Sequence, residues 1–102
     1  MPARNLVIPL EPIQAFCLRW RVVELSLFGS AVRGDFRADS DVDLLVTLAD
    51  DAALDLGDWA TMIEELRGIF GRDVDLVSRR ALRNPFLRHE ILSTHEVIFR
   101  AA

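Results

Sequence analysis

The chain has 102 residues, the length of one domain, and 51% of them are hydrophobic, which excludes a disordered polymer. No apolar run approaches the roughly 18 residues of a membrane-spanning helix, and residues 1–10 lack the pattern of a signal peptide. A formal net charge of -4 disfavours non-specific binding to nucleic acid, and a single cysteine excludes an internal disulfide. We therefore expect one cytoplasmic domain, residues 1–102, with no membrane partner and no direct nucleic-acid binding.

The first two predicted elements are a helix and a strand. Apolar residues recur at helical spacing over residues 9–21 and would form one buried face. That face holds Ile13, Phe16, Cys17 and Trp20. A strand follows over residues 22–28, where Val23, Leu25 and Leu27 would share one side. We interpret Cys17 as a small core residue rather than a catalytic thiol.

A Gly-Ser break and a polar loop separate this strand from the next one. Gly29 and Ser30 end the first strand, and residues 31–34 are compatible with a short helical turn. Residues 42–48 have the alternation of a second strand. Residues 48–55 hold three aspartates without periodicity, which indicates a solvated loop.

The strongest helical pattern covers residues 56–70. Asp55 is placed to cap its N-terminus, and Gly71 stands where the helix should end. Six apolar residues share one face and are expected to be buried: Leu56, Trp59, Ala60, Ile63, Leu66 and Phe70.

The C-terminal third is predicted to form a strand, a helix and a last strand. The strand covers residues 72–78, and the helix covers residues 84–93 with Asn84 as cap and Pro85 in the first helical position. Residues 95–100 could add a final short strand. This order predicts an α/β (α+β) fold, a small mixed sheet of three to four strands with helices packed against one face.

Three aspartates are candidates for a metal site. Because side chains alternate along a strand, Asp41 and Asp43 project from one face, and Asp75 does the same on the third strand. If the two strands are neighbours, the three carboxylates can form a cluster, for which Mg²⁺ held together with substrate phosphates is the best fit. Taken alone, a pair of aspartates on a half-buried sheet is more simply explained as solvent-facing.

The Gly-Ser turn favours the metal interpretation. A small residue lets backbone N–H groups approach a phosphate, and a serine at a helix start can add its hydroxyl. Gly29 and Ser30 as phosphate cradle and the aspartates as metal ligands would be the two halves of a nucleotidyl-transfer site. Arg33 could neutralise triphosphate charge, and an ion pair with Asp35 or Asp39 is an equal alternative.

The stretch FGSAVRGDFRADSDVDLLV carries the pattern Gly-Ser, ten residues, Asp-x-Asp. It resembles the DNA polymerase beta-like nucleotidyltransferase superfamily and, within it, the minimal nucleotidyltransferases. Residues 72–99 also resemble the C-terminal half of that group, so the similarity covers roughly residues 10–100. The resemblance implies the polymerase beta-like nucleotidyltransferase fold.

The resemblance also implies roles for the site residues. Gly29 and Ser30 would position the triphosphate of ATP. Asp41 and Asp43 would hold two Mg²⁺ ions, and Asp75 would bind the catalytic metal and help to deprotonate the acceptor hydroxyl. The implied reaction is attack of that hydroxyl on the α-phosphorus of ATP, with release of pyrophosphate.

A protein partner is implied as well. Minimal nucleotidyltransferases are commonly paired with a HEPN-domain RNase toxin, which the nucleotidyltransferase binds as antitoxin and can AMPylate on a tyrosine. The chain has no tyrosine and no room for an acceptor-binding domain, so the acceptor must come in trans. One alternative is a module that neutralises its partner by occlusion, through apolar residues such as Trp59, Ile69 and Phe86. A weaker one is transfer to a small molecule such as an aminoglycoside.

Three further polar residues are expected to have no catalytic part. Asp73 shares the face of Asp75 but lies further out, which favours a solvated or rim position. His89 and His95 lack metal-ligand spacing and are expected at the surface.

Overall fold

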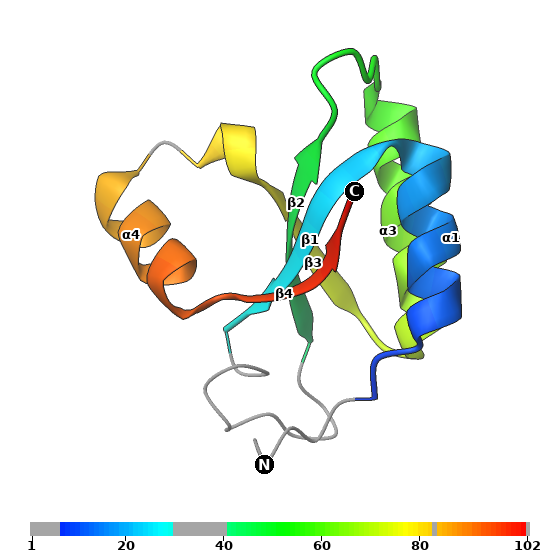
Figure 1. Ribbon diagram of the computed structural model, residues 1–102, viewed down its shortest axis with the longest axis horizontal. Coiled ribbons are helices and arrows are strands. Elements are labelled where there is room, and N and C mark those ends of the chain that lie inside the picture. The colour runs from blue at the N-terminus through cyan, green and yellow to red at the C-terminus, as the bar shows by residue number, and fades with distance from the viewer. Residues whose placement is uncertain (1–6, 30–40, 83, 102) are drawn as a thin grey trace.

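The computed structural model describes residues 7–29, 41–82 and 84–101. Within these ranges the chain forms four strands, three α-helices and one 3-10 helix (Figure 1). In chain order they are α1 (Leu10–Trp20), β1 (Val22–Phe28), β2 (Val42–Leu48), α3 (Leu56–Phe70), β3 (Val74–Ser78), η1 (Arg79–Ala81), α4 (Pro85–Thr94) and β4 (Glu96–Arg100). All the predicted helices and strands in these ranges are confirmed to within two residues, and only η1 was not expected.

The strands form one mixed sheet in the order β3-β2-β1-β4. Strand β1 runs antiparallel to both β2 and β4, whereas β2 and β3 are parallel. A parallel pair needs a crossover connection, and α3 supplies it. The predicted mixed sheet is therefore confirmed, and its two central strands, β1 and β2, are those that flank the Gly-Ser break.

Helices α1 and α3 cover one face of the sheet (Figure 1). The core between them and the strands contains Ile13, Phe16, Cys17, Leu25, Leu27, Val42, Leu44, Val46, Met62 and Leu66, all at most 1% exposed. Every second residue of β2 belongs to this core, as the alternation predicted. The residues of β2 between them, including Asp43, point to the opposite face of the sheet.

Helix α4 lies on the opposite side of the sheet (Figure 1). There Leu45 packs with Leu82 and Ile91 in a second buried cluster. The expectation that the helices pack against one face is therefore wrong. Leu45 follows Leu44 in the same strand, so its side chain must point away from the first core and needs its own cover.

The buried stripe of α3 differs from the predicted one. Met62 and Leu66 are fully buried, whereas Leu56 is 88% exposed and Ala60 is exposed as well. Since the helix meets the sheet along Met62 and Leu66, Leu56 in its first turn is left at the rim of a groove with Leu54. Both predicted ends are confirmed: Asp55 forms a capping box with Asp58, and Gly71 ends the helix with φ 71°.

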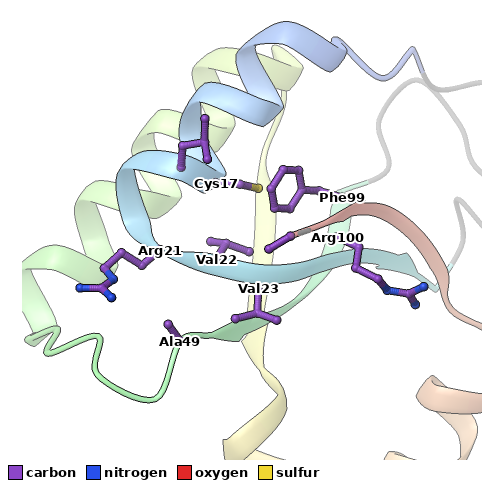
Figure 2. A pocket seen from close by; sticks show the side chains of 9 residues that line it. Cys17, Arg21, Val22, Val23, Ala49, Phe99 and Arg100 are labelled. Carbon is purple, nitrogen blue, oxygen red and sulfur yellow. The ribbon is translucent and has the colours of Figure 1, made fainter.

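Strand β1 also departs from its predicted alternation at its start. The pairing with β2 shifts register between Val22 and Glu24, which is a β-bulge or a similar irregularity. As a result Val22 is buried in the core and Val23 is 40% exposed. Figure 2, a view into the pocket at this end of the sheet, shows the two side chains on opposite sides of β1. From Leu25 onward the predicted faces are correct.

Candidate active site

Asp43 is held in the middle of the site by its strand. Val42 and Leu44 on either side of it are 0% exposed and anchor β2 to the core beneath α1 and α3. The Asp43 side chain consequently projects from the other face, where it is half-buried. The buried neighbours thus fix the direction in which this carboxylate points.

Asp75 lies directly opposite Asp43 in the parallel register of β2 and β3. Neighbouring strands are about 4.8 Å apart, so the two carboxylates stand side by side on one face of the sheet. Asp75 is exposed and belongs to β3, an edge strand of the sheet that the described residues form. The condition on which the sequence prediction depended, that these strands are neighbours, is met.

Asp41 precedes β2 and is exposed. The backbone N–H of the next residue, Val42, donates a hydrogen bond of 2.9 Å to the carbonyl oxygen of Asp73. This bond joins the starts of the two strands that carry the three carboxylates. Asp41 is two residues from Asp43, so the strand period directs it toward the same face.

The three carboxylates lie on the same face and at the same end of the sheet, but their oxygen atoms do not surround a single ion position. Within the described ranges, no three His, Cys, Asp or Glu side chains are close enough to hold an ion together. Their donor atoms nevertheless suit Mg²⁺, which takes oxygen ligands and usually needs only one or two carboxylates beside waters and substrate phosphates. The residues present therefore fit a magnesium ion that is completed by a nucleotide.

Gly29 brings the end of β1 against the same carboxylate. Phe28 is paired with Asp43 across β1 and β2, and Gly29 follows it with φ 72°, in the left-handed region that favours glycine. A Cβ atom at position 29 would lie 3.1 Å from Cγ of Asp43 and would collide with its Oδ2. Position 29 thus needs a glycine for a reason that was not predicted, the nearness of Asp43, and the predicted phosphate cradle stays a prediction.

Two predicted site residues, Ser30 and Arg33, lie outside the described residues, as do Asp35, Asp39 and the turn expected over residues 31–34. Their roles stay predictions.

Two of the three polar residues that were set apart from the site, Asp73 and His95, have partners of their own. Asp73 is exposed and forms an ion pair of 3.1 Å with Arg67, which fits a rim position. The hydrogen bond from Arg67 to Glu64 and the charges of both acids raise the pKa of Arg67. His89 is exposed as expected, but His95 is half-buried, and its Nδ1 donates to the Leu92 carbonyl oxygen at 2.7 Å.

Comparison with known proteins places this geometry in a family. A family model described as "Nucleotidyltransferase domain" matches residues 11–98. A protein adenylyltransferase MntA of Thermococcus cleftensis is 38% identical over 66 residues, which are 65% of each chain. A Methanocaldococcus jannaschii protein provisionally named a protein adenylyltransferase is 30% identical over 73 residues, 72% of this chain and 73% of that one.

Solved structures share the fold. A protein provisionally described as a minimal nucleotidyltransferase has 37% identity and a TM-score of 0.72, over 93% of this chain and 94% of that chain. A chain of a toxin–antitoxin complex with AMP-PNP has a TM-score of 0.73 at 23% identity, over 91% and 74% of the two chains. A chain from the complex of tri-AMPylated Shewanella oneidensis HEPN toxin with MNT antitoxin has a TM-score of 0.64 at 22% identity, over 89% and 69%. From the match over residues 11–98 and the arrangement of the sheet, the chain belongs to the nucleotidyltransferase domain family and has the fold of the minimal nucleotidyltransferases.

Proposed function

We propose that this protein is a Mg²⁺-dependent protein adenylyltransferase of the cytoplasm, the antitoxin that transfers AMP from ATP to a HEPN-family RNase toxin. The observation that carries the proposal is the register that puts Asp43 opposite Asp75, at the end of the sheet where Gly29 meets Asp43. The named adenylyltransferase relatives support a protein acceptor. The solved complex with an AMPylated HEPN toxin supports the identity of that acceptor.

Some residues of the site bind the nucleotide and the metal, and Asp75 acts on the acceptor. Gly29 and Ser30 position the triphosphate, and Asp41 and Asp43 are the ligands for metal. Bound Mg²⁺ supplies positive charge for the attacking and leaving oxygens. As the acceptor oxygen forms its bond to the α-phosphorus and the bond to pyrophosphate breaks, Asp75 accepts the acceptor proton on a carboxylate oxygen.

The position of Asp75 supports an acceptor on another molecule. It is exposed on β3, an edge strand of the described sheet, so a hydroxyl carried by a second protein can approach it from outside. The chain contains no tyrosine, so the tyrosine acceptor that we propose must belong to the partner.

Transfer of label from ATP tests the proposal. Purified protein is incubated with a HEPN-family toxin, Mg²⁺ and ATP labelled at the α-phosphate. We expect label on the toxin with wild type, none with Asp41→Ala, and wild-type labelling with Asp51→Ala. Asp51 is a matched control because it is an exposed aspartate beyond the other end of β2, paired with Arg21. Absence of label with wild type and Asp41→Ala alike would overturn the enzymatic claim.

Neutralisation by occlusion is favoured by one observation. Phe86 on α4 is 86% exposed, and α4 covers the face of the sheet that carries the carboxylates. Trp59 and Ile69, by contrast, pack against the first core. If the double variant Asp41→Asn, Asp43→Asn protects cells from the toxin as well as wild type does, occlusion is the mechanism; if it fails to protect while still binding the toxin, catalysis is.

A further inference from the structure

The backbone of Gly29 and the carboxylate of Asp43 occupy adjoining space. Because Phe28 is paired with Asp43, the chain leaves β1 directly beside this side chain. A Cβ atom on Gly29 would lie 3.4 Å from Cβ and 3.1 Å from Cγ of Asp43, and it would overlap Oδ2. The carboxylate therefore fills the volume that any side chain at position 29 would need.

Asp43 could not keep its present orientation beside such a side chain. Its backbone is fixed by Val42 and Leu44, both 0% exposed. Rotation about χ2 can move Oδ2 away, but Cγ would still lie 3.1 Å from the added Cβ, so the carboxylate would have to turn, take another χ1 rotamer or push back the chain after β1. Mg²⁺ demands near-ideal octahedral geometry at 2.0–2.1 Å, so any of these changes would misplace a ligand.

We propose that Gly29 is a positioning residue for Asp43. Because Gly29 has no side chain, the carboxylate of Asp43 packs directly against its Cα atom, and this contact orients the carboxylate. This role is additional to the room that glycine leaves for a triphosphate. It rests on the proposed function only in that Asp43 binds the metal, because the contact itself does not depend on any ligand.

Gly71 offers a matched control for the glycine backbone. It has φ +71°, against +72° for Gly29, and a Cβ built on it would meet nothing within 4 Å. Alanine at either position adopts the same unfavourable left-handed backbone. Only Gly29→Ala also meets a carboxylate, so the difference between the two variants isolates the contact.

Thermal unfolding tests the contact without metal or nucleotide. We expect Gly71→Ala to lower the Tm by about 4–8 °C, the shift for one strained residue in a chain of this size, and Gly29→Ala to lower it further. In an Asp43→Ala background the effect of Gly29→Ala should shrink to that of Gly71→Ala. If Gly29→Ala does not fold alone, folding of the double variant supports the contact. Equal effects of Gly29→Ala in both backgrounds would refute it.

Mn²⁺ binding without nucleotide tests the positioning role. Free Mn²⁺ is measured by its paramagnetic resonance signal, under conditions in which each variant is folded. Gly29→Ala should weaken binding about tenfold or more, about 1.4 kcal/mol, whereas Gly71→Ala should not change it. Wild-type Mn²⁺ affinity in Gly29→Ala overturns this inference alone if Asp43→Asn weakens binding. If Asp43→Asn leaves Mn²⁺ affinity unchanged, the metal site of the proposed function is overturned as well.

Discussion

Cys17 shows how burial determines the chemistry of a single residue. It is 0% exposed, and Figure 2 shows its sulfur directed toward the ring of Phe99. Desolvation by this burial raises the pKa of its thiol from the ordinary value of 9.0 to about 12. A thiol that stays protonated is a poor nucleophile, which agrees with the interpretation of Cys17 as a core residue.

The stability of the protein above pH 9 should report on Cys17 alone. The chain has no lysine and no tyrosine, and arginine remains charged, so no other side chain titrates between pH 9 and 12. The unfolded thiol loses its proton above pH 9 and the folded one only near pH 12. The free energy of unfolding is therefore undiminished below pH 9 and should fall toward a slope of about 1.4 kcal/mol per pH unit above it.

Urea denaturation from pH 8 to 10.5 measures this slope. The control is Cys17→Ala, which should be less stable at every pH because it leaves a cavity, but whose unfolding free energy should be flat over this range. A slope that survives in Cys17→Ala would show that another group is responsible.

Ser26 has a polar side chain that is buried without a hydrogen bond among the described residues. It is 1% exposed on β1, and within the described ranges its Oγ has no hydrogen-bond partner. An unsatisfied buried hydroxyl costs about 1–3 kcal/mol, so Ser26→Ala should raise the free energy of unfolding by about 1 kcal/mol. Urea denaturation at neutral pH measures the change. A loss of stability of that size would mean that the hydroxyl is bonded.

At the scale of elements, α3 separates what a local pattern can predict from what packing decides. Its ends follow from Asp55 and Gly71, because capping acts within a few residues of the chain. Its buried face does not follow, since Leu56 has the same spacing as the buried residues but stands in the first turn at the rim of a groove. Periodicity predicts which face of a helix is apolar, but which turns of the helix lie over the sheet depends on tertiary packing.

Alanine substitutions along α3 test this assignment. Leu66→Ala should lower the free energy of unfolding by about 2–5 kcal/mol, because Leu66 is 0% exposed in the core. Leu56→Ala removes the same atoms from a side chain that is 88% exposed and should change it by less than about 0.5 kcal/mol. Comparable losses in urea denaturation for both variants would contradict the burial described.

At the scale of the whole molecule, the site depends on strand pairing that the sequence contains only in part. The alternation around Asp43 and Asp75 predicted the face of each carboxylate, and the parallel register joins them once α3 has carried the chain across. The contact of Gly29 with Asp43 was not predicted, because it requires the antiparallel register of β1 with β2. The sequence thus predicted the face on which Asp43 and Asp75 lie, and the strand register determined that Asp75 and Gly29 are the neighbours of Asp43.

Because the carboxylates gather on one face of the sheet, they repel one another, and a bound metal ion should relieve this repulsion. The apolar core beneath α1 and α3 supports one face of the sheet, while the other face carries the carboxylates of Asp41, Asp43 and Asp75 on neighbouring strands. Two like charges about 4 Å apart repel by about 1 kcal/mol when water screens them fully. Without metal, the double variant Asp41→Asn, Asp43→Asn should therefore be more stable than wild type by about that amount.

Added Mg²⁺ should reverse the order of the two proteins. At a hundred times its dissociation constant, a ligand that binds only the folded state adds about 2.7 kcal/mol, so Mg²⁺ should raise the Tm of wild type and EDTA should remove the gain. The double variant should not respond. A matched control is Asp50→Asn, Asp51→Asn, which neutralises two exposed aspartates that pair with Arg80 and Arg21 and should leave the Mg²⁺ response intact. All of these proteins share the same core, so a difference in their response to Mg²⁺ must come from the substituted carboxylates. If the Asp41→Asn, Asp43→Asn variant responds to Mg²⁺ as wild type does, the ion binds elsewhere on the molecule.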